Sequence, residues 1–209
     1  MNMTERGQSF VGDVRLLASS LLDGIAALEP GLWDQPAGSL SWTRWETAEH
    51  VADDLMVYAA TVAAPTVTGD IPFETTQRRP GSPDELMHCD REAGPDGLAA
   101  MIEAASNILI AVVAVSPPDI SVAHVFGQTN GEGFAAMAAV ELIVHGHDLF
   151  DGTDIEWNPD GLLCRRVLVR LFPDVDAPPD VDPFTLLLWA TGRSEMPDRA
   201  MRSEWRWYN

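Results

Sequence analysis

The chain has 209 residues, of which 46% are hydrophobic and 22% charged, an ordinary balance for a globular protein with one substantial core. Its 13 basic residues are all arginine and are outnumbered by 32 acidic ones, which gives a formal net charge of −19 at pH 7. Such an acidic excess argues against nucleic acid or an anionic membrane as a partner, because both are bound through basic surfaces.

The ends and the cysteines indicate where the chain resides. Residues 1–10 lack the basic start and apolar core of a signal peptide, and the longest uninterrupted apolar run, 108–115, is too short to span a bilayer. Cys89 and Cys164 form no Cys-x-x-Cys pair, as is typical of reduced thiols. We expect a soluble cytoplasmic protein.

The first half of the chain predicts two long helices. Apolar residues recur at spacings of three and four over 10–28, and Glu29-Pro30-Gly31 closes that helix. Thr43 and Glu46 form a capping box, so a second helix should begin there and end before Pro65.

Two further long helices are predicted after a loop over 65–82 that is dense in Pro and Gly. Ser82-Pro83-Asp84-Glu85 has the pattern of a second capping motif, which predicts a short helix that Gly94-Pro95 interrupts. The helical pattern resumes over 96–115, and 119–131 reads as a loop that could hold a short hairpin. A fourth long helix is expected over 133–150.

The C-terminal part predicts shorter elements. Asn158-Pro159 and Asp182-Pro183 each resemble a helix start, with an N-cap followed by Pro. The aromatic end, 203–209, predicts a short strand or an ordered tail. We therefore expect a mainly all-α fold: an antiparallel four-helix bundle over 1–152, and a short helical extension over 153–209 packed on it.

The fourth predicted helix carries a buried polar pair. Glu141 is the only charged residue between 134 and 144, and His145 lies one turn further on the same face. A carboxylate in such a helix must be hydrogen-bonded, paired or bound to a metal. The residues alone allow either an intrahelical hydrogen bond in a core or a metal site, and His50 in the second helix is the candidate third ligand.

Three motifs resemble those of a known family. Trp42-Thr43, Glu46 and His50 resemble the second-helix signature of the DinB superfamily, and more narrowly of its mycothiol-dependent maleylpyruvate isomerase-like branch. The run 141–149, Glu-Leu-Ile-Val-His-Gly-His-Asp-Leu, is similar to the fourth-helix motif of that branch, and 186–193 is similar to a C-terminal motif.

The resemblance implies a divalent metal, with zinc expected, held by His50, Glu141 and His145. Two imidazoles and one carboxylate form zinc sites that keep positions open for water or a thiolate. The implied cosubstrate is a low-molecular-weight thiol such as mycothiol, whose sulfur would attack a small electrophilic substrate. The implied activity is that of a thiol transferase or isomerase.

The chain departs from the family pattern in two places. His147 stands where the family often has tryptophan; it points to a different helical face from His145, so we do not expect it to be a ligand. Asp148 lies near the face of His145 and could orient that ligand or be a solvated helix end.

The C-terminal part is the second departure. Maleylpyruvate isomerases are expected to carry a C-terminal domain that is larger than the segment following residue 150 in this chain.

Other polar and aromatic residues are weaker candidates. Arg193 could hold a substrate carboxylate, although capping of helix carbonyls after Gly192 is the commoner role. His88 and His124 read as surface histidines. The aromatic residues of 205–208 could cover a site or a dimer surface, and the apolar content is compatible with a homodimer.

Two alternatives to a thiol-dependent enzyme stay open at this stage. The chain could be a non-catalytic helical binding protein, metal-binding or metal-free, in which the triad is a polar core network. Less favoured is direct hydrolysis by a metal-bound water, which would need no thiol.

Overall fold

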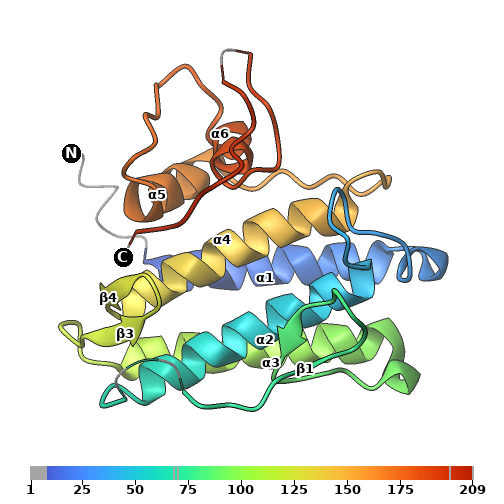
Figure 1. Cartoon of the computed structure of the whole chain (residues 1–209), viewed down its shortest axis with the longest axis horizontal. Helices are drawn as coiled ribbons and strands as arrows, with labels where there is room; N and C mark the ends of the chain where they lie inside the picture. The colour runs from blue at the N-terminus through green and yellow to red at the C-terminus, as the bar shows by residue number, and fades with distance from the viewer. Residues whose placement is uncertain (1–8, 68, 70, 198, 209) are drawn as a thin grey trace.

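The computed structural model describes residues 9–67, 69, 71–197 and 199–208. Four long helices form a bundle (Figure 1). Helices α1 and α2 both pack against α3 and α4, and α3 and α4 also contact each other to a smaller extent. This confirms the predicted mainly helical fold; the helices are α1 (Phe10–Ala27), α2 (Arg44–Ala63), α3 (Gly94–Val115) and α4 (Gly131–Phe150).

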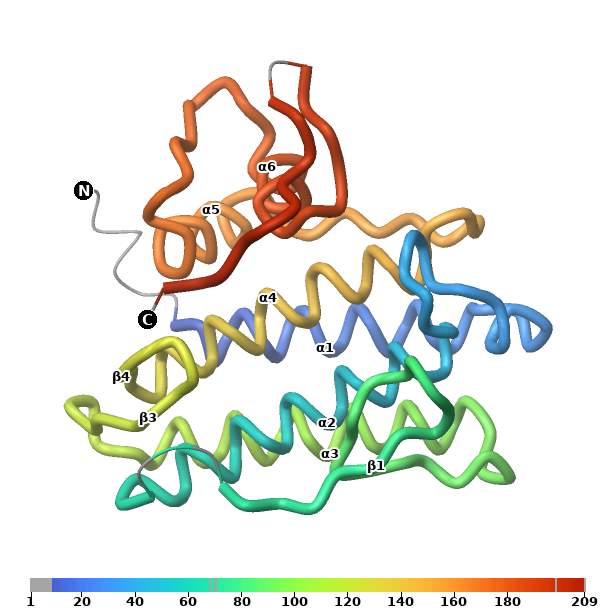
Figure 2. The backbone as a smooth tube through the Cα atoms, viewed as in Figure 1, coloured from blue at the N-terminus to red at the C-terminus, as the bar shows by residue number. Residues whose placement is uncertain are grey.

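The helix directions differ between neighbouring pairs. Figures 1 and 2 show α1 and α4 running one way and α2 and α3 the other. Side-chain contacts agree, since the start of α1 meets the start of α4 through Phe10 and Glu132, whereas Arg44 at the start of α2 meets the end of α4 at Leu149. The α1–α3 and α2–α4 pairs are therefore antiparallel, as expected. The pairs α1–α4 and α2–α3 are parallel, so the chain needs the long connection 64–93 to return from the end of α2.

Helix α4 is buried nearly all round. Among its residues only Glu132 and His147 are not buried, which matches the apolar sequence of this helix. Above it in Figure 1, the short helix α5 (Gly161–Leu171) packs on the outer face of α4, and α6 (Pro183–Ala190) packs on α5.

Several helix ends differ from the sequence expectation. Asp160, rather than Asn158, caps α5 by accepting hydrogen bonds from the backbone of Leu162 and Leu163. Gly94-Pro95 begins α3 instead of interrupting a helix, because Pro lacks only an N–H that the first turn does not use. The starts of α2 at Thr43 and of α6 at Asp182 are as predicted.

Within the described residues, four short strands form two hairpins. The predicted helix at Ser82–Glu85 was wrong: strand β2 (Asp84–Glu85) pairs antiparallel with β1 (Thr76–Gln77), and the short helix η2 (Arg91–Ala93) follows. The expected hairpin in 119–131 is present as β3 (Val122–His124) and β4 (Gly127–Thr129). No strand occurs within 203–208; this segment is an ordered irregular tail.

One helical stretch, Arg91–Val115, is long and apolar enough to cross a membrane by length and composition alone, with a mean hydropathy of 2.1 in its most apolar window. Polar residues interrupt its apolar sequence, so the uninterrupted run 108–115 was too short to predict a membrane span. In the structure, 39% of that window is buried, and Leu98, Ile102 and Leu109 belong to the core of the bundle.

Candidate metal centre

The N-terminal end of α2 is fixed to the C-terminal end of α4. Thr43 and Glu46 form both hydrogen bonds of the predicted capping box. The buried guanidinium of Arg44 donates to the carbonyl oxygens of Leu149 and Asp151, each at 2.8 Å. These carbonyls are left free at a helix end, so one buried arginine satisfies both and sets α2 beside α4.

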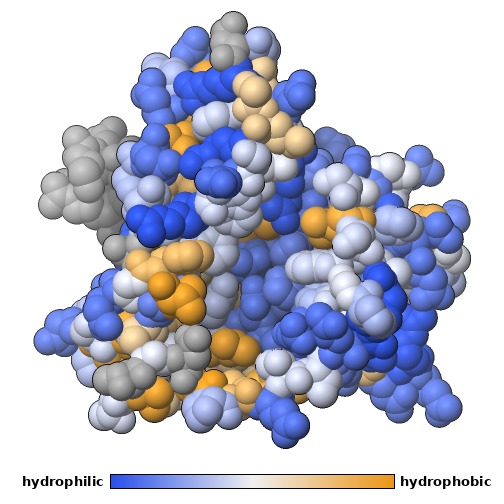
Figure 3. Space-filling model, in the orientation of Figure 1, coloured by the Kyte–Doolittle hydropathy of each residue, from blue (hydrophilic) through white to orange (hydrophobic). Residues whose placement is uncertain are grey.

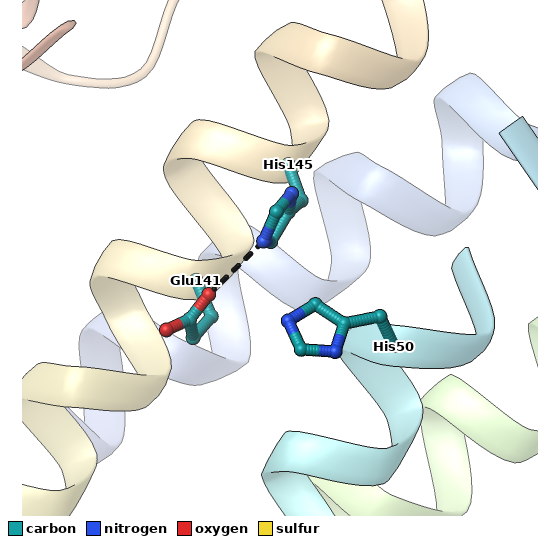
Figure 4. A group of neighbouring side chains, drawn as sticks. All are labelled: His50, Glu141 and His145. Atoms are coloured by element: carbon teal, nitrogen blue, oxygen red, sulfur yellow. Dashed lines mark ion pairs between the residues drawn. The ribbon is translucent and has the colours of Figure 1, made fainter. Parts of the chain in front are cut away.

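His50, Glu141 and His145 converge between these two helices. Glu141 and His145 are one turn apart on α4, both 5% exposed, with Oε2 and Nε2 separated by 3.2 Å. His50 projects from α2, and Figure 4 shows its ring turned toward the other two. One ligand atom from each of the three residues lies within 4.8 Å of the others.

The donor set fits a divalent metal. Two imidazole nitrogens and a carboxylate oxygen are the ligands of zinc sites that leave coordination positions open. The structure thus brings together all three residues that the sequence pointed to.

Buried carboxylates contact the outer nitrogens of both histidines. Asp148 Oδ2 lies 3.0 Å from His145 Nδ1, and Glu85 Oε1 lies 3.0 Å from His50 Nδ1. A carboxylate at Nδ1 favours the tautomer whose Nε2 is free to bind a metal. On the other side of the site, Tyr58 donates to Glu141 Oε1 at 3.4 Å.

Arg193 contacts Asp148 rather than standing free in the site. Its Nε lies 3.0 Å from Asp148 Oδ1, its Nη2 lies 2.8 Å from Oδ2, and its Nη1 donates to the carbonyl of Thr191. Burial alone would raise the pKa of Asp148, but His145 and Arg193 outweigh it and hold that pKa below its usual value. A substrate-binding role for Arg193 stays a prediction.

The electrostatics of the site favour positive charge at its centre. Burial alone would lower the pKa of His50, but Asp54, Glu85 and Glu141 outweigh it and raise that pKa to about 10. Burial likewise opposes ionisation of Glu141, yet His145 and His50 hold its pKa below the ordinary value. Acidic groups surround the position between the histidines, which suits a cation there.

A cavity of about 490 Å³ opens over the three residues, a size in the range of small-molecule sites. Figure 3 shows this face hollowed between the C-terminal part and the bundle, with hydrophilic residues in the recess. Trp205 and Trp207 of the tail line it, so these two residues lie at the cavity. Their expected role in a dimer surface stays a prediction. The other lining residues are Ser39, Leu40, Trp42, His50, Asp54, Tyr58, Glu141, Val144, His145, Thr191, Gly192 and Arg193.

The remaining predicted candidates lie apart from this cluster. His147 stacks edge-on against Phe184, on the other side of α4. His88 contacts Thr76 in the 76–89 segment, and His124 packs among Phe126, Phe134 and Trp207.

Sequence reasoning missed four residues around the site: Arg44, Asp54, Tyr58 and Glu85. Asp54 and Tyr58 follow His50 by one and two turns on α2, so helical spacing could have placed them beside it. Glu85 is distant in sequence and carried no usable signal.

Comparison with known proteins agrees with a DinB-like helical fold. The family model described as mycothiol maleylpyruvate isomerase N-terminal domain matches residues 14–150. The chain therefore belongs to this family, as its motifs had suggested.

Two solved structures are similar over most of the chain. They are a mycothiol-dependent maleylpyruvate isomerase and its H52A mutant, each with a TM-score of 0.62 and 15% identity, covering 91% of this chain and 95% of that one. The expected larger C-terminal domain is therefore wrong for these isomerase chains, which are matched almost end to end. No curated protein sequence matches the chain.

Proposed function

We propose that the chain is a metal-dependent enzyme, with zinc as the expected metal, that uses a low-molecular-weight thiol such as mycothiol as cosubstrate. It would act as a thiol transferase or isomerase on a small electrophilic substrate. The observation that carries the proposal is the set His50, Glu141 and His145 at a cavity in a chain of this family.

His50, Glu141 and His145 would hold the metal. A divalent cation bound there would favour the thiolate form of a thiol at neutral pH and so supply a nucleophile. Asp148 would keep the imidazole of His145 in the tautomer that presents Nε2, and Tyr58 would hold the unbound oxygen of Glu141.

The cavity walls would bind and orient the two small molecules. Trp42 lies against His50 and His145, with ring centroids 5.0 and 6.1 Å away, and would exclude water from one side of the histidines. Trp205 and Trp207 close the cavity from the C-terminal side. Holding nucleophile and electrophile together in such a space replaces an encounter in solution by a positioned reaction.

We also propose that the chain has two parts with different roles at the site. Residues 1–152 would form the metal-binding bundle. Residues 153–209 would form a short extension that contributes Arg193 and the aromatic wall.

Elemental analysis of the tag-free protein tests the metal centre. We expect about one equivalent of divalent metal in the wild type and none in His145→Ala. His147→Ala is the matched control, because it removes an imidazole from the same helix outside the cluster and should keep the metal.

A loaded protein would then be assayed with a thiol and electrophiles. Turnover that requires the thiol would support the enzyme. No metal in the wild type, even after zinc is offered and excess removed, would leave a helical protein with a polar core network and contradict the proposal.

A further inference from the structure

The connection between α2 and α3 is bound along one face of α2. Arg78 Nε donates to the buried Glu49 at 2.6 Å, and the backbone N–H of Cys89 reaches the same carboxylate at 2.7 Å. One turn further, Asp53 accepts from the backbone of Met87 at 2.7 Å. These bonds fix residues 78–89 against successive turns of α2.

Glu85 lies within this fixed segment and faces His50. It belongs to β2, where it pairs with Thr76 of β1, and its side chain is only 3% exposed. Its Oε1 is 3.0 Å from His50 Nδ1. The other ring nitrogen of His50, Nε2, is thereby turned to the interior of the site, toward Glu141 and His145 (Figure 4).

We propose that Glu85 is a positioning residue that sets the ring orientation and tautomer of His50, and that the α2–α3 connection, bound along α2, places Glu85 at that ring. The inference rests on the proposed metal centre. Glu85 would not touch the metal; it would act through His50, as a hydrogen-bonded carboxylate fixes and strengthens an imidazole ligand.

The arrangement gives both histidines the same kind of support from different parts of the chain. His145 has Asp148 three residues away on its own helix, whereas His50 receives its carboxylate from 35 residues downstream. Because α3 runs parallel to α2, the chain must pass back along the full bundle, and Figure 2 shows this return over 64–93. This return brings the carboxylate of Glu85 to Nδ1 of His50. The acid one turn further along α2, Asp54, lies at the other ring nitrogen, Nε2, and so does not contact Nδ1.

Binding of Zn²⁺, measured by competition with a chromophoric chelator, tests the inference. Glu85→Ala should weaken Zn²⁺ binding by about 10- to 100-fold, the usual effect of losing such a partner. Glu85→Gln should lose less, because its amide oxygen still accepts from Nδ1–H.

Two control variants distinguish the positioning of His50 by Glu85 from two other effects: the loss of a negative charge nearby, and the loosening of the α2–α3 connection. Asp84→Asn removes one negative charge from the exposed neighbouring residue, and Glu46→Gln weakens the ion pair that holds Arg79 of the same connection. Neither contacts His50, so both should bind Zn²⁺ as the wild type does.

A second readout follows the His50 ring directly. Nitrogen NMR of the Zn²⁺-loaded protein, in which the His50 ring is neutral, should show a hydrogen-bonded Nδ1–H on His50 in the wild type and in Glu85→Gln, and loss of that hydrogen bond in Glu85→Ala. Wild-type Zn²⁺ affinity together with an unchanged His50 signal in a folded Glu85→Ala protein would overturn this inference alone. A wild type that binds no Zn²⁺ would overturn the metal centre and this inference together.

Discussion

The guanidinium of Arg193, which is 10% exposed, and the buried carboxylate of Asp148 form a two-point ion pair, with Nε at 3.0 Å and Nη2 at 2.8 Å from the carboxylate oxygens. Asp148 lies on α4 beside His145, and Arg193 follows α6 in the C-terminal part. The pair therefore joins the two parts of the chain at the candidate metal centre.

Removing one partner of this pair should cost more than removing both. Arg193→Met leaves the buried carboxylate of Asp148 without its cation, which costs about 3–5 kcal/mol of unfolding free energy. When Asp148→Asn is added, both side chains are neutral and their burial costs less. We expect Arg193→Met to be less stable than the double variant with Asp148→Asn. Urea unfolding of the wild type, both single variants and the double variant, at neutral pH with a chelator present, measures the coupling energy between the two side chains. Losses of unfolding free energy that simply add in the double variant would contradict this prediction.

The aromatic wall should affect substrate use and not metal content. Trp205 lines the cavity and lies 3.4 Å from the Cβ position of Gly192. Trp205→Ala should raise KM about 2- to 10-fold, corresponding to the 0.5–1.5 kcal/mol typical of one aromatic contact. Tyr208→Ala, in the same tail but outside the cavity lining, is the control. Loss of metal from Trp205→Ala would show a structural role instead.

Two helical glycines should respond oppositely to alanine. A Cβ on Gly146, next to His145, would lie 2.4 Å from the ring of Trp157, whereas a Cβ on Gly12 would meet nothing within 4 Å. Gly146→Ala should lower the unfolding free energy by about 1–3 kcal/mol through overpacking. Gly12→Ala should raise it by about 0.5–1 kcal/mol through helix propensity. Chemical denaturation of both variants measures these signs, and a neutral Gly146→Ala would mean that Trp157 can move aside.

Both cysteines should be unreactive in the folded protein. Burial, followed by the nearby Asp182 and Asp160, raises the pKa of Cys164 to about 12, and burial also raises the pKa of Cys89. Because the thiolate is the reactive form, a raised pKa lowers its population at pH 8. Iodoacetamide should label both only after unfolding in urea, as mass spectrometry would show. Rapid labelling of the native protein would contradict the buried positions.

Local patterns in the sequence determined the four long helices, because helix formation there depends on apolar periodicity and on caps within a few residues. The Thr43–Glu46 capping box and the Asp182 cap are of this kind. The Glu141–His145 pair was equally visible, since residues four apart on a helix must share a face. His50 in the second predicted helix was the candidate third ligand, and the family motifs pointed to the same residue.

Only the tertiary structure decided what these helices bring together. The parallel course of α2 and α3 depends on which helix faces pack, and no local signal encodes it. The Ser82–Glu85 segment shows the consequence: its local pattern favours a helix cap, but pairing with β1 and contact with His50 hold it extended. Arg193 and Trp205 likewise reach the cavity through packing of the C-terminal part on α4. Such long-range contacts arise from burial and ion pairing between segments far apart in the chain, which short-range patterns cannot specify.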